Sequence, residues 1–212
     1  FGKKPTSKIL CKLLDKLKTQ TYLVDYWQRY NDDCPNFIQA PIDVFCNNQI
    51  SKIDCKGKPD WENLLYSFEK KIDILIQSET DYSEASIARI CHESLENGDQ
   101  FIIGNSMPIR DVDKFTSVSG MQIDTYSNRG ASGIDGVIST ALGVSIVKND
   151  RRSLLIIGDV SFYHDMNGLL ASKYDMNITI VVINNNGGGI FSFLPFANAG
   201  MDTFQEYWTT DT

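Results

Sequence analysis

The sequence lacks the features of a nucleic-acid-binding or membrane protein. Its 20 Lys and Arg residues stand against 27 Asp and Glu, giving a net charge of −7 and a pI near 4.8. A basic face for nucleic acid or an anionic membrane is therefore not expected. No apolar run approaches the about 18 residues that a membrane span needs, and the N-terminal stretch FGKKPTSK is not a signal peptide. We expect a globular protein of the cytoplasm.

Zinc-binding cysteine patterns are also absent. The five cysteines contain no Cys-x-x-Cys pair: they are Cys11, Cys34, Cys46, Cys55 and Cys91. Cys46 and Cys55 are nine positions apart with no histidine near them, and the chain has two histidines in all. We expect reduced thiols, as in most cytosolic proteins.

The 212 residues suffice for one sizeable core, or for one domain and part of another. A helical pattern over residues 5–17, an apolar strand over 21–26 and an irregular polar stretch after it cannot close a core alone. The first residue is Phe1 rather than Met, so we expect the chain to begin within a longer protein. The expected parts are the end of a middle domain (1–58), a linker helix (59–80) and a second domain that stops early (81–212).

The second domain alternates between strand-like and helix-like segments. Three apolar runs without polar alternation, at 101–104, 154–158 and 178–183, predict strands buried on both faces. Helical patterns lie at 59–77, 82–95 (with Ser83 as N-cap), 135–147 and 165–174 (opened by Asp165 and Asn167). This alternation predicts an α/β fold with a doubly wound parallel sheet, preceded by a remnant of another α/β domain.

Glycines and small oxygen-bearing side chains follow each predicted strand. These loops are Gly104-Asn105-Ser106, Gly158-Asp159-Val160-Ser161 and the triplets at 184–186 and 187–189, with a fourth, SNRGASGIDG, at 127–136. Ligands of open parallel sheets bind beyond the carboxyl ends of the strands. Glycine allows close approach of the backbone, and the polar groups can bind an anion or a metal.

One carboxylate with amide and backbone oxygens suits a hard cation such as Mg²⁺, which takes about six oxygens, some from substrate phosphates and water. Asp159 would supply the carboxylate, one asparagine of the triplet a side-chain oxygen, and a following glycine its carbonyl. The helix predicted from Asp165 would direct N–H groups at phosphates. A Gly-Asp pair alone is weak evidence for a metal site. Its combination with Asn-Asn after the next predicted strand is strong evidence for one.

These motifs resemble those of thiamine-diphosphate enzymes, which carry Gly-Asp followed by a double asparagine at the spacing found here, 25 positions from Asp159 to Asn184. Four stretches are similar, in order, to the C-terminal diphosphate-binding domain of the MenD family, the carboligases of menaquinone biosynthesis: GNSMPIRDVD (104–113), SNRGASGIDGVISTALG (127–143), GDVSFYHDMNGLL (158–170) and INNNGGGIFSFLP (183–195). The resemblance covers 80–212 densely, extends to 1–58, and implies the thiamine-diphosphate-binding fold. Val160 departs from the general Gly-Asp-Gly pattern, but this family tolerates an aliphatic residue there.

The resemblance implies a site for thiamine diphosphate and Mg²⁺ or Mn²⁺. The metal ligands it assigns are Asp159, Asn185 (or a neighbouring asparagine) and the carbonyl of Gly187. The cofactor-binding residues are Ser106, Ile134, Gly158, Asp159, Val160, Ser161, Asn185 and Gly187, with Ile134 as an aliphatic wedge under the cofactor. Substrate-binding residues are Arg110 and Arg129, which would bind carboxylates from loops at the sheet edge, and Ile190, Phe191 and Leu194, which would line the pocket.

The resemblance also implies the partners. The full-length enzyme would decarboxylate 2-oxoglutarate and add the succinyl-semialdehyde unit to isochorismate. Its active site would be shared between subunits of a homodimer or homotetramer, with an activating glutamate on the N-terminal domain of the neighbouring subunit. We therefore expect no catalytic residue in this chain, and we expect the chain alone to be inactive and to bind the cofactor weakly. No nucleic-acid or membrane partner is expected.

Three alternatives remain open. One is another thiamine-diphosphate decarboxylase or carboligase, such as an acetolactate synthase-like enzyme, and another is a non-catalytic assembly module. A Rossmann nucleotide-binding domain is the weakest, because GASGIDG is not Gly-x-Gly-x-x-Gly and no predicted strand directly precedes it.

Overall fold

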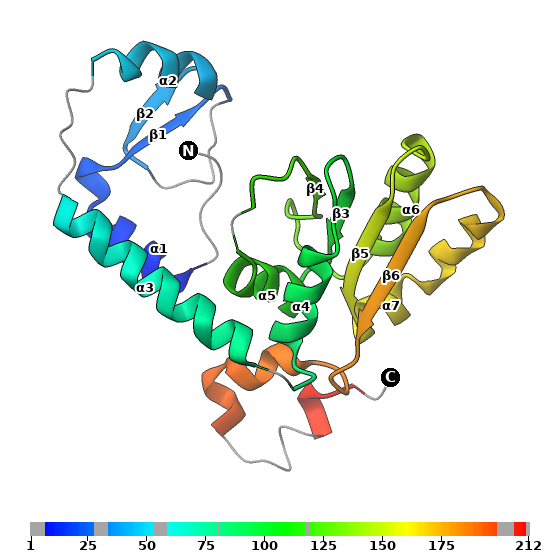
Figure 1. Cartoon of the computed structure of the whole chain (residues 1–212). Helices are drawn as coiled ribbons and strands as arrows, with labels where there is room; N and C mark the ends of the chain where they lie inside the picture. The colour runs from blue at the N-terminus through cyan, green and yellow to red at the C-terminus, as the bar shows by residue number, and fades with distance from the viewer. Residues whose placement is uncertain are drawn as a thin grey trace. The chain divides into compact units, whose positions relative to one another are not determined.

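The computed structural model describes residues 7–27, 34–52, 59–79, 81–117, 119–198 and 206–210. The chain divides into two compact units, Phe1–Ser67 and Phe68–Thr212 (Figure 1). The helix α3 (Pro59–Ser78) starts in the first unit and ends in the second, which confirms the helix predicted over 59–77. The domain boundaries themselves remain a prediction.

The first unit contains a small parallel sheet. Its elements are α1 (Lys8–Lys16), the 3₁₀ helix η1 (Lys18–Gln20), β1 (Tyr22–Asp25), β2 (Asn36–Gln39) and α2 (Ile42–Ile50). The side chain of Ser7 accepts a hydrogen bond from the N–H of Leu10 and caps α1. The predicted helix and strand are thus confirmed within the described residues.

The prediction of an irregular chain after the first strand was wrong. The residues of β2 pair in parallel with those of β1, from Tyr22 opposite Asn36 to Asp25 opposite Gln39, and α2 follows directly. A four-residue strand has too few positions to show a periodic pattern, and its stability comes from the partner strand rather than from local sequence. Residues 28–33 and 53–58 of the predicted irregular stretch lie outside the described residues.

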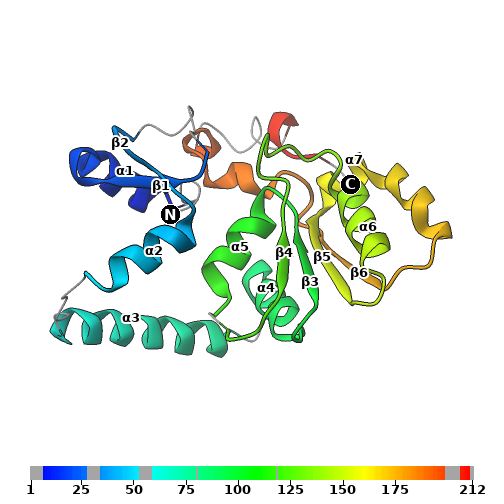
Figure 2. The same cartoon turned by 90° about the horizontal axis from the view of Figure 1, so that it is seen from above.

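The second unit is a parallel sheet with helices on both faces (Figure 2). Its strands run in the order β4-β3-β5-β6, with bounds β3 (Gln100–Ile103), β4 (Asp124–Tyr126), β5 (Ser153–Gly158) and β6 (Ile178–Ile183). Its α-helices are the end of α3, α4 (Glu84–Glu93), α5 (Met107–Phe115), α6 (Val137–Val147) and α7 (Asp159–His164). Its 3₁₀ helices in the described part are η2 (Met166–Lys173), η3 (Gly189–Phe193) and η4 (Pro195–Asn198), and residues 206–208 are also helical. The predicted fold class is confirmed.

Two apolar clusters explain why the strands show no polar alternation. On one face, Phe101, Ile103, Leu154, Ile156 and Ile183 pack with Ala88, Cys91 and Leu95 of the α4 region. On the other face, Ile102, Leu155 and Ile157 pack with Val137, Ile138, Ala141 and Leu142 of α6. Successive strand residues point to opposite faces, so a strand buried on both faces must be apolar at every position. This holds for β3 and β5. The prediction that 178–183 is also buried on both faces was wrong, because β6 is the last strand of the described sheet and its Thr179 and Val182 are exposed.

Three elements of this unit differ from the sequence prediction. The short elements α5 and β4 were not predicted, and β4 ends just before the loop at 127–136. The helix after β5 begins at Asp159 rather than at Asp165, and residues 166–173 form a 3₁₀ helix. The carboxylate of Asp165 accepts hydrogen bonds from the N–H (2.7 Å) and hydroxyl (3.0 Å) of Ser139, so it caps the first turn of α6 rather than its own helix.

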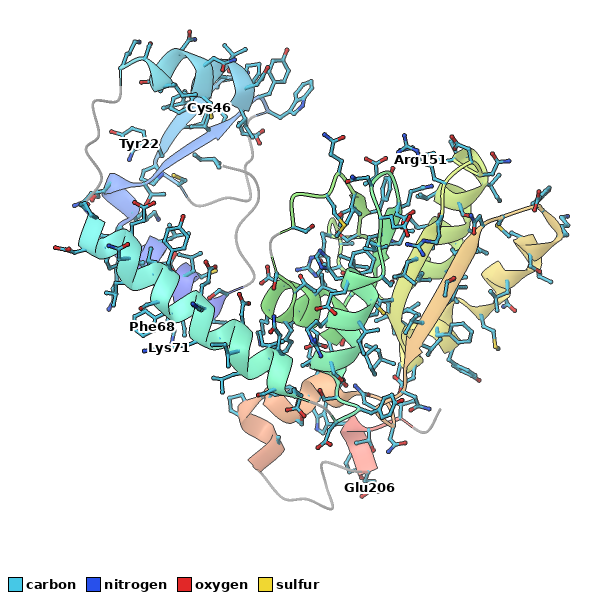
Figure 3. The ribbon with its side chains drawn as sticks, viewed as in Figure 1. Tyr22, Cys46, Phe68, Lys71, Arg151 and Glu206 are labelled. Carbon is cyan, nitrogen blue, oxygen red and sulfur yellow. The ribbon has the colours of Figure 1, made fainter. Side chains whose placement is uncertain are left out.

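Charged side chains gather at the amino-terminal edge of the sheet, away from the strand ends that carry the polar loops. Lys148 and Arg151 each donate to the carboxylate of Asp124 at 2.8 Å, and Arg151 is labelled in Figure 3. These cations lower the pKa of Asp124, with the Lys148 hydrogen bond as the largest cause. Ion pairs therefore occupy the amino ends of the strands, and the polar loops that could bind a ligand lie at the carboxyl ends.

Candidate functional site

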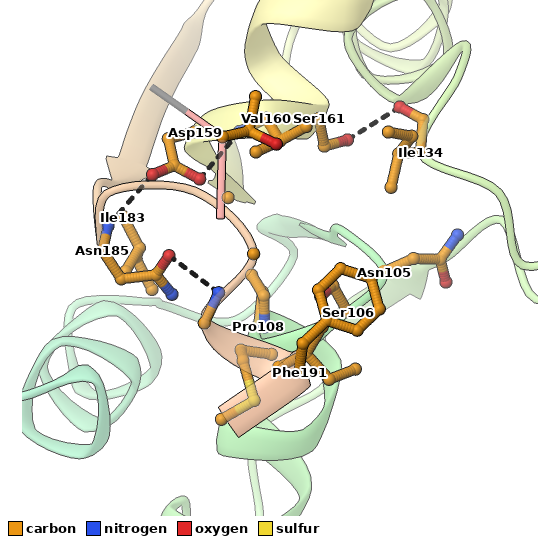
Figure 4. A pocket seen from close by; sticks show the side chains of 16 residues that line it. Asn105, Ser106, Pro108, Ile134, Asp159, Val160, Ser161, Ile183, Asn185 and Phe191 are labelled. Carbon is orange, nitrogen blue, oxygen red and sulfur yellow. Dashed lines mark hydrogen bonds between the residues drawn. The ribbon is translucent and has the colours of Figure 1, made fainter. Parts of the chain in front are cut away.

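The ends of β5 and β6 bring the Gly-Asp and asparagine motifs together. Gly158 pairs with Ile183 in the parallel register, so Asp159 and the asparagine triplet leave adjacent strands at the same edge. The backbone N–H of Asn185 donates to Oδ2 of Asp159 at 3.1 Å (Figure 4). The N–H of Gly187 donates to the same oxygen at 2.8 Å. The predicted meeting of the two turns is confirmed.

Asp159 is held as a buried acceptor at the start of a helix. Asp159 is the first residue of α7. Oδ1 of its carboxylate accepts a hydrogen bond of 2.7 Å from the N–H of Val160. The residue is 7% exposed. Free N–H groups at a helix start favour a negative charge, which explains how a carboxylate is stable in this position.

The turn after β6 explains why asparagines and glycines follow the most apolar strand. Asn186, Gly187 and Gly188 have positive φ values of 61°, 71° and 72°, in the left-handed region that glycine and asparagine tolerate best. The side chain of Asn184 accepts a hydrogen bond from the N–H of Asn186 at 2.9 Å, which fixes the start of the turn. The turn reverses the chain and exposes backbone groups to Asp159.

The side chain of Asn185 lies between two partners. Its Nδ2 donates to Oε1 of Glu84 at 2.6 Å. Its Oδ1 accepts a long contact of 3.4 Å from the N–H of Gly189. The oxygen and nitrogen ends of this carboxamide therefore face different surroundings.

These loops enclose a pocket of about 140 Å³. Nine of the predicted site residues line it: Ser106, Ile134, Gly158, Asp159, Val160, Ser161, Asn185, Ile190 and Phe191. Asn105, Met107, Pro108, Ile183, Gly188, Gly189 and Thr210 also line it (Figure 4). The predicted residues Gly187, Leu194, Arg110 and Arg129 are not among the lining residues, although Gly187 contacts Asp159.

The two predicted substrate-binding arginines hold the loop after β3. Arg110 lies on α5, not on a loop as predicted, because α5 begins three residues earlier; its Nη1 donates to the carbonyl of Ser106 at 2.5 Å. Nη1 of Arg129, on the loop after β4, donates to Oδ1 of Asn105 at 3.2 Å. Both guanidinium groups therefore lie beside the same two-residue segment.

The segment they hold is strained. Ser106 has φ 70° and ψ −125°, a conformation that costs a residue with a side chain of order 1–3 kcal/mol and that clusters at functional sites. Asn105 beside it is 2% exposed, and its Nδ2 donates to the carbonyls of Asn128 (3.0 Å) and Gly133 (2.6 Å). Asn105 thus ties the loop after β3 to the loop at 127–136.

Ile134 is fixed by a contact to the Gly-Asp turn. Its carbonyl accepts a hydrogen bond from the hydroxyl of Ser161 at 2.8 Å, and its side chain lines the pocket. Ser161 is 3% exposed, so this contact is sheltered from water. An apolar side chain is thereby presented between the polar loops.

Three residues near the site were missed in the sequence. The sequence predicted Asn105 only as part of a loop, and its position near the end of a buried strand was the available signal. Glu84 and Asp111 carried no signal, because both lie within helical patterns where acidic residues are common. Asp111 is 2% exposed; burial, the charge of Glu84 and a hydrogen bond to Glu84 raise its pKa to about 7.

The donor set fits a hard cation. A carboxylate, a carboxamide oxygen and backbone carbonyl oxygens are the ligand types that Mg²⁺ prefers. Asp159 and the turn that carries Asn185 and Gly187 offer these types, and the hydrogen bonds between them hold the two turns together. In the described part of the chain no group of three or more His, Cys, Asp or Glu side chains forms a metal site, so a site here depends on amide and backbone oxygens. Among the same residues, no helix combines the length and apolarity that crossing a bilayer requires.

The comparison with family models defines the class. Residues 115–208 match the thiamine pyrophosphate enzyme, C-terminal TPP binding domain. This range contains the loop at 127–136, the Gly-Asp turn and the asparagine turn. The fold of this part of the chain is therefore that of a thiamine-diphosphate enzyme C-terminal domain.

Similar proteins define the branch of that class. The chain is 42% identical over 212 residues to the 2-succinyl-5-enolpyruvyl-6-hydroxy-3-cyclohexene-1-carboxylate synthase of Listeria innocua serovar 6a. It is 38% identical over 203 residues to that of Bacillus cytotoxicus and 46% identical over 184 residues to that of Staphylococcus aureus. These alignments cover 93%, 92% and 86% of the chain. The predicted relationship to the C-terminal portion of the MenD family is confirmed.

The same alignments cover 36%, 34% and 31% of the three synthases, so the chain spans about a third of the length of the curated relatives it matches. Because all three relatives are named as this synthase, the comparisons do not favour the alternative of an acetolactate synthase-like enzyme.

Proposed function

We propose that the chain forms the diphosphate-binding side of the active site in a carboligase of the MenD type, dependent on thiamine diphosphate and Mg²⁺ or Mn²⁺. The full-length enzyme decarboxylates 2-oxoglutarate and transfers the succinyl-semialdehyde unit to isochorismate. The product is 2-succinyl-5-enolpyruvyl-6-hydroxy-3-cyclohexene-1-carboxylate, the compound in the names of the relatives. We place this reaction in menaquinone biosynthesis in the cytoplasm.

The observation that carries the proposal is the contact between Asp159 and the turn at Asn185–Gly187. Two N–H groups of that turn bind one carboxylate oxygen. Asp159 and Asn185 therefore line the pocket together, and the Gly187 backbone lies beside Asp159. In the proposed site Asp159, Oδ1 of Asn185 and the carbonyl of Gly187 hold the cation. Phosphate oxygens and water complete the about six ligands that Mg²⁺ takes.

Gly158, Val160 and Ser161 at the start of α7 would lie against the diphosphate. Bound thiamine diphosphate supplies the chemistry of decarboxylation and carbon–carbon bond formation, whereas the protein binds and orients it. Ile134 presents the apolar wedge against the cofactor, and Ser161 fixes its backbone. Ser106 lies across the pocket in a strained conformation and would offer its hydroxyl to cofactor or substrate.

Arg110 and Arg129 would bind the carboxylates of both substrates. Each is partly buried, and a guanidinium with a planar fork pairs well with a carboxylate. Their present contacts, to Ser106 and Asn105, keep both cations beside the pocket rim. Ile190, Phe191 and Leu194 would supply apolar contacts to the substrate chain.

A second subunit would complete the site. The pocket of about 140 Å³ is small beside the about 300–1,000 Å³ typical of ligand sites. In the proposed homodimer or homotetramer, a neighbouring subunit contributes the remaining wall and the glutamate that activates the cofactor. The residues of this chain then bind and orient, and none of them is assigned a proton-transfer step.

The test uses the full-length protein that contains this chain, loaded with thiamine diphosphate and Mg²⁺. We expect CO₂ release from 2-oxoglutarate in preference to pyruvate, and product formation when isochorismate is added. Preference for pyruvate would indicate an acetolactate synthase-like enzyme. Absence of Mg²⁺-dependent cofactor binding in calorimetry would instead indicate a non-catalytic assembly module.

A further inference from the structure

Glu84 contacts the proposed metal ligand Asn185 from outside the metal site. Its Oε1 accepts a hydrogen bond of 2.6 Å from Nδ2 of Asn185, 101 positions later in the sequence. Glu84 does not line the pocket, and the functions proposed above give it no role. This contact is therefore a candidate for controlling how Asn185 is presented.

The chemistry of a carboxamide makes its orientation important. One end of the Asn185 side chain donates and the other accepts, and a cation binds only the oxygen end. A carboxylate such as Glu84 has no proton to donate when ionised, so it can bind only Nδ2. Oδ1 must then lie on the other side, where its one contact among the described residues is the long one to the N–H of Gly189, 3.4 Å. A carbonyl oxygen has two lone pairs, so Oδ1 retains capacity for a cation.

Glu84 is itself held on a rigid element. It is the first residue of α4, where Ser83 and Ser86 form a capping box. Negative charge at a helix start is stabilised by the free N–H groups there. Ala88 and Cys91 of the same helix are buried in the core, so α4 cannot move without disturbing the sheet.

A second carboxyl group lies behind Glu84. Asp111 of α5 is 2% exposed, and its carboxyl group is near enough to Glu84 that, after burial, the charge of Glu84 and hydrogen bonding with it raise the pKa of Asp111. The backbone of Glu84 is thus fixed by α4, and its carboxylate interacts with Asp111 and with Asn185. A side chain held in this way can fix the rotation of its partner.

We propose that Glu84 is a positioning residue for the cation site. It holds the Asn185 carboxamide with Nδ2 turned away from the metal and Oδ1 turned toward the position that Asp159 and Gly187 share. The proposal rests on the proposed function, since it assigns Glu84 a role toward that cation. Partners of metal ligands act in this way in other sites, and their removal typically costs about 10–100-fold in metal affinity.

The test measures Mn²⁺ affinity by electron paramagnetic resonance in the full-length protein with thiamine diphosphate present. Glu84→Met keeps the length of the side chain but removes the acceptor, and Glu84→Gln keeps an oxygen that can accept from Nδ2. We expect Glu84→Met to weaken Mn²⁺ binding about 10–100-fold, and Glu84→Gln to weaken it much less. Wild-type affinity in Glu84→Met would overturn the proposal. Equal losses in both variants would also overturn it, because they would indicate charge rather than orientation.

Testing Glu84→Met in an Asn185→Asp variant shows whether Glu84 acts by orienting the Asn185 carboxamide or whether its loss simply disrupts the fold. Asn185→Asp offers an oxygen at both ends, so it needs no orienting partner. We expect Glu84→Met to leave Mn²⁺ affinity unchanged or improved in the Asn185→Asp background, since it also removes a like charge. A further loss of the same size in that background would contradict a positioning role.

Failure of the proposed function is distinguishable from failure of this inference. Wild-type protein that binds no Mn²⁺ with thiamine diphosphate would reject the metal site itself. If Glu84→Met does not fold by near-ultraviolet circular dichroism, the wild-type crystal structure with Mn²⁺ and thiamine diphosphate decides. Nδ2 of Asn185 should remain on Glu84 while Oδ1 binds the metal, and loss of the Glu84 contact on metal binding would overturn the proposal.

Discussion

The backbone N–H of Gly187 donates a hydrogen bond of 2.8 Å to Oδ2 of Asp159, 28 residues earlier in the chain. This contact joins the turn after β5 to the turn after β6 and sets the spacing between the carboxylate and the asparagine turn. A cation held at this edge would therefore meet ligands that are positioned before it binds. Preorganisation of this kind reduces the cost of assembling a site.

Replacing Asp159 should abolish metal-dependent cofactor binding. Asp159→Ala removes the one carboxylate of the proposed ligand set and the acceptor of three backbone N–H groups. We expect the affinity for thiamine diphosphate in Mg²⁺ to fall by more than about 100-fold, beyond the about 10–100-fold typical of outer-sphere partners. Fluorescence titration measures it.

Asp165→Ala is the matched control for Asp159→Ala. Asp165 caps α6 through Ser139 and does not line the pocket. Its loss should cost about 0.5–2 kcal/mol of stability, as for a helix cap, with near-normal cofactor affinity. Similar losses of affinity in the two variants would argue against a metal role for Asp159.

The two arginines should affect substrate more than cofactor. Arg110→Ala and Arg129→Ala each remove a charge-assisted contact to a carboxylate, worth about 1.5–3 kcal/mol, so KM for 2-oxoglutarate or isochorismate should rise about 10–100-fold. Cofactor affinity should stay near normal. Arg151→Ala, at the opposite edge of the sheet, is the control and should leave KM unchanged. Equal losses of substrate and cofactor affinity would contradict the assigned roles.

The asparagine turn should not tolerate a side chain at Gly187. Its φ of +71° costs other residues about 1–2 kcal/mol, and a Cβ there would overlap the carbonyl of Thr210. We expect Gly187→Ala to lower the free energy of unfolding by more than about 1 kcal/mol. Gly143→Ala, at an exposed position inside α6 with open space around it, should instead stabilise by about 0.5–1 kcal/mol. Thermal unfolding of both variants checks the contrast.

Stability should depend on pH through Asp111. Burial and the charge of Glu84 raise its pKa from 3.8 to about 7, while Lys114 and Arg110 act in the opposite direction. The folded state therefore holds the proton more tightly than the unfolded state. The stabilisation is full below about pH 4 and is lost as pH rises through about 7.

We expect the wild-type unfolding temperature to fall more between about pH 5 and pH 8 than that of Asp111→Asn, which carries no titrating group. Asp113→Asn, on the same helix but exposed, is the control and should retain the wild-type pH dependence. Identical pH dependence in wild type and Asp111→Asn would refute this origin of the effect.

Much of the fold could be predicted because the second unit follows simple rules. Strands buried on both faces must be apolar throughout, and 101–104 and 154–158 stand out for that reason. The run at 178–183 was found by the same rule, although β6 is the last strand of the described sheet and its Thr179 and Val182 are exposed. The meeting of Asp159 with the asparagine turn followed from the parallel order of β5 and β6. The short elements β2 and β4 were missed, because three or four residues carry no periodic signal and depend on partner strands.

The site could be predicted in its motifs but not in its supporting contacts. Glycine and asparagine turns are visible in sequence because the backbone demands those residues. The contact of Glu84 with Asn185 spans 101 positions, and that of Asp165 with Ser139 runs against the local expectation that Asp165 caps its own helix. Such contacts depend on how the helices pack against the sheet, so no local sequence pattern predicts them.

The most direct test is an anomalous difference map of the full-length protein crystallised with thiamine diphosphate and Mn²⁺. A single peak is predicted within coordination distance, about 2.0–2.3 Å, of the Asp159 carboxylate, Oδ1 of Asn185 and the carbonyl of Gly187. A peak elsewhere, or a bound diphosphate with no metal between these two turns, would contradict the account.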